Sequence, residues 1–329
     1  MNTEKYKRNV NLDLIKTLAC ICVVGLHAVG MGNYTIYYLC DCGVPLFFLV
    51  NGYLLFSKGK IDYHYTFHKI FNILKVVFLW NFTITIPVFV FRHKIANPFK
   101  LTVNSLLQRG YLWHFWFFGA LIIIYLLLPI FHHFFFPKTN YHKAGCIILM
   151  CTCIVLSAVS MIKGFPIQKF IPQSLRLWTW LFFFLTGGLL AVSSPVKHHL
   201  SLITHSILLF IFTVINNVVV KKIGLFLIHE RLAEFFYDDI TSIIWYILLF
   251  TFLLRIPIKE SLAPLISNLS QLTMGIFIIH PLLLTVLSTL YIPSGALTII
   301  IFWLGIVFSS LIISFGLSKI PIINNMIRL

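Results

Sequence analysis

The first long apolar segment of the chain carries ionisable side chains whose types and spacing are suited to chemistry. Asp13, Lys16 and His27 lie within residues 12–31. Ionisable side chains are costly inside a membrane, so they usually face a bundle interior or a wet cavity and mark function. Lys16 and His27 are eleven residues apart, which places both on one helix face about 16 Å apart along the axis, and Asp13 falls within about 40° of that face. The spacing predicts a cation near one end of a helix and an imidazole deep in the membrane.

A long, thin ligand with an anionic head would contact both Lys16 and His27. Acetyl-coenzyme A has this form, with phosphates at one end, a pantetheine arm, and a thioester at the other end. The alternative reading is that Lys16 extends to the membrane interface and that His27 binds a neighbouring backbone carbonyl. The residues alone leave both readings open.

A second polar pattern opens the next apolar segment, where Asp41 precedes Pro45 and Asn51-Gly52 follows. Pro45 suits the first turns of a helix, where a missing amide donor costs little. Gly52 with Asn51 would let another backbone or a ligand approach closely. A contact between Asp41 and His27 would fix the imidazole tautomer and raise its basicity. The alternative is a solvated loop aspartate.

Two further histidines lie in apolar surroundings. His114 and Trp116 belong to an aromatic run that is typical of an interfacial belt. His280 directly precedes Pro281, a pair that is typical of a helix kink with a satisfied histidine. The seven cysteines show no Cys-x-x-Cys or Cys/His metal spacing, so we predict small buried side chains and no metal site.

The elements that must position these residues are membrane helices. The chain is 59% hydrophobic and 10% charged, whereas a soluble domain carries about a quarter charged residues. We therefore predict an all-α polytopic membrane protein, with one membrane domain over residues 1–329, a retained first span and no fused soluble domain. The ten predicted spans are 12–31, 38–56, 70–91, 115–136, 144–162, 175–193, 201–220, 240–256, 269–291 and 296–318.

The formal net charge of +16 comes from basic residues scattered over many loops. This distribution predicts contact with anionic membrane lipids and topology signals, and it argues against a nucleic-acid partner. Fifteen Lys and Arg on the side of the N-terminus against ten on the other side predict that both termini are cytoplasmic. The outer segment from Lys221 to Asp239 contains four of the nine acids, and we predict an amphipathic outer helix or a lid there.

Four motifs, in order, resemble the acyltransferase 3 family of integral membrane acyltransferases, many of which O-acetylate bacterial surface glycans. In the opening span of that family, a basic residue and a histidine are separated by ten positions, as Lys16 and His27 are in this chain. The motifs are Asn11-Leu12-Asp13-Leu14-Ile15-Lys16 with Val23-Val24-Gly25-Leu26-His27, Gly43-Val44-Pro45-Leu46-Phe47-Phe48 with Asn51-Gly52-Tyr53, His114-Phe115-Trp116 with Ile124-Tyr125 and Pro129, and Leu272-Thr273 with Gly275 and His280-Pro281.

The chain also departs from the family pattern. Lys16 stands where Arg is more common, which weakens bidentate phosphate recognition but keeps the charge. Asn51 stands where Ser is usual. Many members carry two arginines, three positions apart, at the head of the third span. Lys69 matches the first of these, and Lys75 is the candidate for the second.

The resemblance implies an O-acetyltransferase of the bacterial inner membrane that uses acetyl-CoA as donor substrate, has no tightly bound cofactor, and modifies a surface glycan or its lipid-linked sugar unit. His27 acts as a general base or carries the acetyl group as an acyl-imidazole, two mechanisms that the sequence does not separate.

The competing class is a transporter, flippase or polymerase-like protein for polyprenyl-linked glycans. A structural membrane subunit would leave the alignment of Lys16 with His27 unexplained, and the oligomeric state stays open. The predicted catalytic residues are His27 and Asp41, and the predicted substrate-binding residues are Lys16, Asp13, Lys69, Lys75, Asn51, His114, Trp116 and His280.

Overall fold

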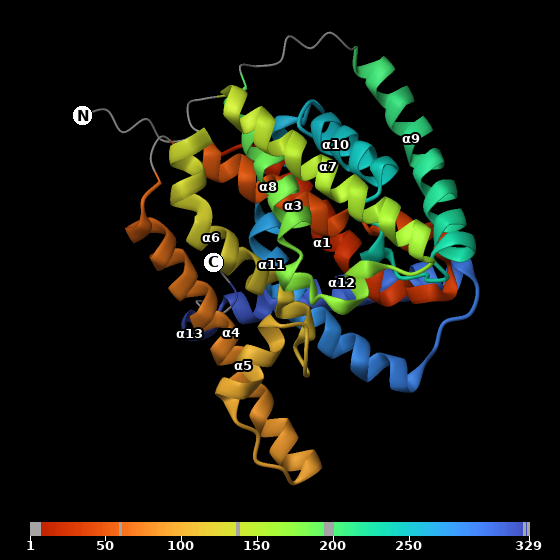
Figure 1. Cartoon of the computed structure of the whole chain (residues 1–329). Helices are drawn as coiled ribbons and strands as arrows, with labels where there is room; N and C mark the ends of the chain where they lie inside the picture. The colour runs from red at the N-terminus through yellow and green to blue at the C-terminus, as the bar shows by residue number, and fades with distance from the viewer. Residues whose placement is uncertain (1–7, 59–60, 136–138, 194–200, 325–326, 328–329) are drawn as a thin grey trace.

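The computed structural model describes residues 8–58, 61–135, 139–193, 201–324 and 327. Every regular element within these ranges is a helix (Figure 1), which confirms the predicted all-α class. Eight of the described segments are long and apolar enough to cross a membrane. They contain α1 (Val10–Val29), α2 with α3 (Tyr34–Cys40 and Gly43–Phe56), α4 (Tyr63–Arg92), α6 (Trp116–Phe135), α7 (Thr139–Lys163), α9 (Leu202–Lys222), α11 (Ala263–Leu290) and α12 (Ala296–Ser318).

Two shorter apolar helices complete the set, α8 (Leu177–Val192) and α10 (Ile240–Leu253). At 1.5 Å per residue they measure only about 21–24 Å, less than a hydrocarbon core of roughly 30 Å. Each of the ten predicted spans overlaps one of these ten segments. The predicted order of ten apolar helical segments agrees with the fold, but only eight of them, within the described residues, are long enough to be candidate membrane spans.

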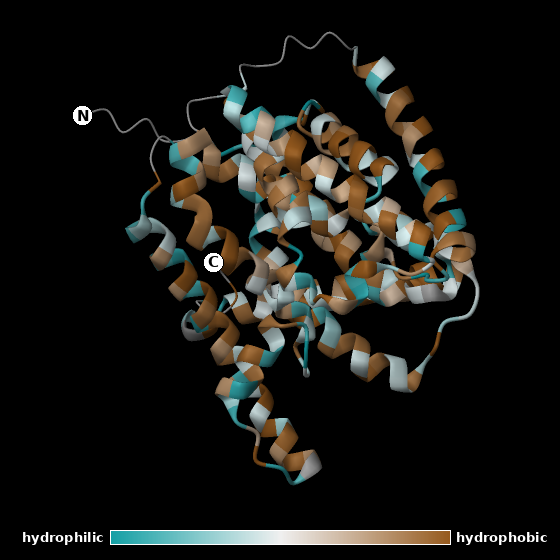
Figure 2. Cartoon of the chain, viewed as in Figure 1, coloured by the Kyte–Doolittle hydropathy of each residue, from teal (hydrophilic) through white to brown (hydrophobic). Residues whose placement is uncertain are grey.

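The helices divide into an inner group and an outer group. The most apolar stretches of α1 and of α2 with α3 are 67% and 72% buried, whereas those of α9 and α12 are each 17% buried. In Figure 1, α1, α3 and α8 lie in the middle and α9 runs along the edge. Figure 2 shows that α9 nevertheless carries mostly hydrophobic residues. Exposed apolar helix surface of this kind is expected where lipid is the solvent.

Close backbone contact joins α3 to α8, the pair of helices that pack most extensively. A Cβ on Gly52 would overlap the carbonyl of Phe184, and a Cβ on Gly187 would overlap the carbonyl of Leu49. Glycine is required because only a residue without a side chain permits this approach. The close backbone approach predicted at Gly52 is confirmed.

The second predicted span begins four residues early and is broken. Asn33 caps α2 by accepting a hydrogen bond from the backbone N–H of Ile36 at 3.2 Å. The chain then turns at Asp41 and Cys42 before α3 begins at Gly43. Pro45 falls in the first turn of α3, where the helix has no use for its missing N–H. The break places Asp41 inside the bundle.

The acid-rich segment before α10 is not the amphipathic helix that we predicted. A π-helical turn (Ile223–Leu227) is followed by irregular chain with one short 3-10 turn (Ala233–Phe235). Asp238 is 2% exposed and accepts hydrogen bonds from Gln168, Trp178 and Thr179. Asp238 therefore ties this segment to the bundle, while Asp239 caps α10 by accepting a hydrogen bond from the backbone N–H of Thr241.

Two further α-helices in the described ranges have no counterpart among the predicted spans, α5 (Pro98–Leu106) and the four-residue α13 (Pro321–Asn324). The short α5 starts at a proline and is capped by Asn97. It follows α4, whose 30 residues extend about 45 Å, well beyond a hydrocarbon core. The far end of α4 projects away from the other helices (Figure 1), and α5 packs beside it.

Candidate active site

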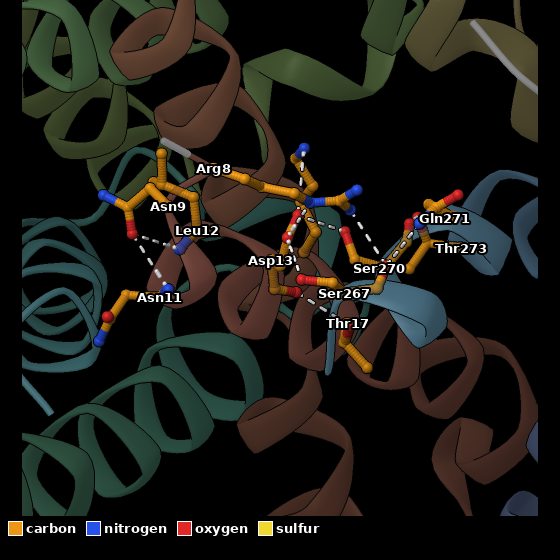
Figure 3. Close-up of polar contacts among 11 residues, drawn as sticks. Arg8, Asn9, Asn11, Leu12, Asp13, Thr17, Ser267, Ser270, Gln271 and Thr273 are labelled. Atoms are coloured by element: carbon orange, nitrogen blue, oxygen red, sulfur yellow. Dashed lines mark hydrogen bonds and ion pairs between the residues drawn. The ribbon is translucent and has the colours of Figure 1, made fainter. Parts of the chain in front are cut away.

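The first turns of α1 are held by a hydrogen-bond network centred on Asp13, which is 3% exposed (Figure 3). Its carboxylate forms an ion pair with Arg8 at 2.5 Å and accepts hydrogen bonds from Ser267 and Ser270 of α11 at 3.0 and 2.8 Å. Arg8 also donates to the carbonyl of Ser267. Asp13 therefore fixes α1 against α11 and holds Arg8 beside the helix.

Lys16 lies three residues further along α1, with its Nζ 3.9 Å from Asp13 and its side chain 30% exposed. Both residues line a pocket of about 900 Å³. Arg8, Lys58 and Lys69 line the same pocket, and Asp13 is the one acid among its described lining residues. We call Arg8, Lys16, Lys58 and Lys69 the cationic mouth. Such a concentration of positive charge with low-dielectric walls attracts an anionic ligand.

Beyond the cationic mouth the pocket is mostly aromatic. Its one prominent polar pair is Asn51 and Tyr125, in which the tyrosine hydroxyl donates to the amide oxygen at 3.3 Å. The amide nitrogen of Asn51 donates to the backbone carbonyl of Phe47 at 2.8 Å, which fixes the orientation of the amide. The aromatic and aliphatic lining residues include Phe47, Phe117, Phe118, Leu121, Met274 and Phe277.

The opposite end of α1 carries His27 in its last turn, where three histidines meet. The rings of His27 and His280 stack with centroids 5.4 Å apart and an interplanar angle of 15°. His114 approaches His280 at 5.9 Å, and the edge of Trp113 meets His27 at 5.0 Å. We call His27, His114 and His280 the histidine cluster. It joins three separate parts of the chain: α1, the 3-10 turn Trp113–Phe115 and α11.

The tautomer of His280 follows from its neighbours. Its Nδ1 lies 3.1 Å from the carbonyl oxygen of Ile276, and because a carbonyl only accepts hydrogen bonds, Nδ1 must carry the proton. In the neutral ring Nε2 then has a free lone pair. This atom is buried and has no hydrogen-bond partner among the described groups, and both ring nitrogens of His114 are in the same state. Unpaired buried nitrogens are rare and are often explained by an absent water or ligand.

Asp41 is fully buried at the break between α2 and α3. Its neighbours are Tyr246 of α10 and Cys22 of α1, and neither of its carboxylate oxygens forms a hydrogen bond with a described group. None of its described contacts involves His27. The structure does not bring the predicted His27–Asp41 pair together, because the helix break directs Asp41 towards α10.

Lys75 and Trp116 belong neither to the residues that line the pocket nor to the histidine cluster. Lys75 is exposed on α4, whereas Lys69 lines the pocket. Their separation of six residues rotates Lys75 by about 240°, which puts it on a different helix face. Trp116 is buried and packs against Trp180 of α8 at 5.1 Å. Asn51 lines the pocket, whereas His27, His114 and His280 form the histidine cluster and are not among the residues that line the pocket.

Sequence reasoning missed several residues of this site. Arg8 and Lys58 were counted as topology signals, because both lie at the ends of apolar segments where no helical periodicity applies. Trp113 was included in an aromatic belt, and Phe277 had no distinguishing chemistry. Within the described ranges, no group of three or more His, Cys, Asp or Glu side chains has the geometry of a metal site.

Comparison with known proteins identifies the family of this chain. Residues 9–319 match the acyltransferase domain family. Over 152 residues the chain is 28% identical to serine/alanine racemase from Enterococcus gallinarum, a match that covers 42% of this chain and 22% of the racemase. The chain thus spans about a fifth of that relative, and no solved structure matches it. Because the family match runs through nearly all the long apolar helices and through both ends of the site, the chain belongs to the acyltransferase 3 family.

Proposed function

We propose that this acyltransferase moves the acetyl group of acetyl-coenzyme A to a hydroxyl of a surface polysaccharide or of its lipid-linked sugar unit. The observation that carries the proposal is the pocket of about 900 Å³, which has a cationic mouth at one end and reaches the neighbours of the histidine cluster at the other. Acetyl-CoA has its phosphates, its uncharged arm and its thioester in the same order.

The phosphates would bind at the cationic mouth. Arg8 is held by Asp13, so its guanidinium has a fixed position from which the remaining N–H groups can donate. Lys16 and Lys69 add two compact charges on one side of the pocket. Four cations against one acid that is already paired leave a surplus of positive charge for a polyanionic donor.

The uncharged pantetheine arm would run through the aromatic part of the pocket. This arm contains amide groups, which lose free energy when they are buried without hydrogen bonds. Asn51 and Tyr125 are lining residues that can donate and accept such bonds. The proposal therefore assigns Asn51 to the arm of the donor, in agreement with its predicted role in substrate binding.

His27 would carry the chemistry, and two routes fit. As a general base, it removes the proton from the sugar hydroxyl, the oxygen attacks the thioester carbonyl, and the CoA thiolate leaves and is protonated by the imidazolium. As a nucleophile, its ring nitrogen takes the acetyl group with release of CoA, and the sugar hydroxyl then attacks the acyl-imidazole. His280 and His114 border His27 and offer further nitrogens for a polar substrate.

The proposal also sets the orientation of the protein in a bacterial inner membrane. Acyl-CoA is made in the cytoplasm, so the cationic mouth and the N-terminal end of α1 would face that side, with both termini cytoplasmic. The scattered basic residues would contact anionic lipids. The acceptor glycan would then approach the histidine cluster from the end of the bundle at which that cluster lies.

The decisive experiment follows radiolabel from acetyl-CoA into glycan. Membranes from cells with and without the intact gene are incubated with the labelled donor, and the glycan fraction is isolated and analysed by mass spectrometry. We expect label and the mass of an added acetyl group only when the protein is intact. Movement of unmodified glycan across the membrane without label transfer would reject the proposal in favour of a transporter.

A further inference from the structure

Phe277 of α11 is shared between the pocket and the histidine cluster. Its ring lines the pocket and also lies 5.2 Å from His114 and 6.0 Å from His280, measured between ring centroids. The side chain is 9% exposed. A donor whose thioester lies close to the histidines must therefore place its acyl group beside this ring.

The position of the Phe277 ring is fixed by other aromatic side chains. Phe118 meets it at 5.5 Å in an edge-to-face arrangement, and Phe117 approaches at 5.9 Å. Phe115, which is not among the pocket-lining residues, stacks on it at 6.5 Å. A ring held by three aromatic neighbours resists displacement, because packed interiors accommodate added volume poorly.

We propose that Phe277 forms the floor of the donor pocket and restricts the acyl group to about the size of acetyl. This inference rests on the function proposed above. An acetyl group adds one methyl beyond the thioester carbonyl, whereas a butyryl group must push two further methylenes against the ring. One methylene in an apolar pocket typically changes preference by about 10–200-fold, so a fixed floor gives a strong selection by chain length.

The test compares the affinity of CoA, acetyl-CoA and butyryl-CoA for the full-length protein in detergent, measured by calorimetry. The variant Phe277→Leu removes the aromatic ring from the floor of the pocket. The matched control Phe183→Leu makes the same change at a buried phenylalanine of α8 that is not among the pocket-lining residues and has no ring contact with Phe277. For the wild type and the control we expect acetyl-CoA to bind about tenfold or more tightly than butyryl-CoA. In Phe277→Leu this ratio should fall to about threefold or less. Phe277→Met, whose side chain is smaller than that of phenylalanine and flexible, should move the ratio in the same direction and serves if the leucine variant does not fold.

The outcomes separate this inference from the proposed function. A wild type that binds none of the three CoA compounds would overturn both. A wild type that binds acetyl-CoA and butyryl-CoA equally, or Phe277 variants that keep the wild-type ratio, would overturn the role of Phe277 and leave the donor assignment intact. An equal fall of the ratio in Phe183→Leu would show that general loosening of the aromatic core, rather than loss of the Phe277 floor, changes the selection, and it would overturn the role of Phe277.

Discussion

His27 is the one partly exposed member of the histidine cluster, since His114 and His280 are 2% and 0% exposed. We expect His27→Ala to lower the rate of acetyl transfer by about 10²–10⁴-fold, the usual contribution of a general base. Donor affinity should change little, because the phosphates bind at the other end of α1. Label transfer and calorimetry measure the two quantities, and transfer at the wild-type rate by a folded variant would contradict the assignment.

Lys16 and Lys75 are both lysines that the sequence predicts to bind the donor. Lys16 lines the pocket, whereas Lys75 is exposed on α4, so Lys75 is a matched control for Lys16. Lys16→Ala should weaken acetyl-CoA binding about tenfold, since loss of a charge-assisted hydrogen bond costs about 1.5 kcal/mol or more. Lys16→Arg should bind as well as the wild type or better, because a guanidinium suits phosphate. Lys75→Ala should keep the wild-type Kd. Calorimetry in detergent compares all four proteins, and equal affinities throughout would reject the phosphate role of Lys16.

At the scale of helices, much of the fold could be predicted. Long apolar runs and the helical repeat were sufficient for ten spans in order, and they aligned Lys16 with His27 on α1. Features that depend on which helices pack against each other could not be predicted from the sequence. The break at Asp41 and the irregular chain near Asp238 exist because those carboxylates face other helices. Periodicity tells which face of a helix is polar but not which helix lies opposite, so the meeting of His27, His114 and His280 could not be derived from the residues alone.

The contact between α3 and α8 allows a test of element packing. Gly52→Ala would push a methyl group into the carbonyl of Phe184, and α8 would have to move. We expect a loss of about 1–3 kcal/mol of stability, the usual range for overpacking. The matched control is Gly305→Ala on α12, where nothing lies within 4 Å of the added Cβ and helix propensity favours alanine. Thermal unfolding in detergent should lower the Tm of the first variant and leave that of the second unchanged or raised; equal Tm values would contradict the packing argument.

At the scale of the whole molecule, the two groups of polar residues that make up the site lie at opposite ends of α1. Its N-terminal end lies at the cationic mouth and its C-terminal end at the histidine cluster, so one helix of 20 residues joins the two halves of the site over about 30 Å. The inner helices around α1 are mostly buried, whereas α9 and α12 present apolar surface. Asp13 and His280 are therefore enclosed by protein although the outer helices present apolar surface, while the cationic mouth stays partly exposed. This enclosure explains why polar groups such as Asp13 and His280 are tolerated here.

The orientation of the whole molecule is open to a direct test. His64 is exposed near the cationic mouth, and Arg109 is exposed four residues before Trp113, whose ring contacts His27 at the other end of α1. In a Cys151→Ala background, which removes the exposed native thiol, single cysteines are placed at positions 64 and 109. A membrane-impermeant maleimide should label the Arg109→Cys protein in intact cells and the His64→Cys protein only after the membrane is opened. The physical reason is that a pocket that takes acyl-CoA must open to the cytoplasm, where that donor is present. Labelling in the reverse order would turn the cationic mouth outward, and an acyl-CoA could then no longer be the donor that enters there.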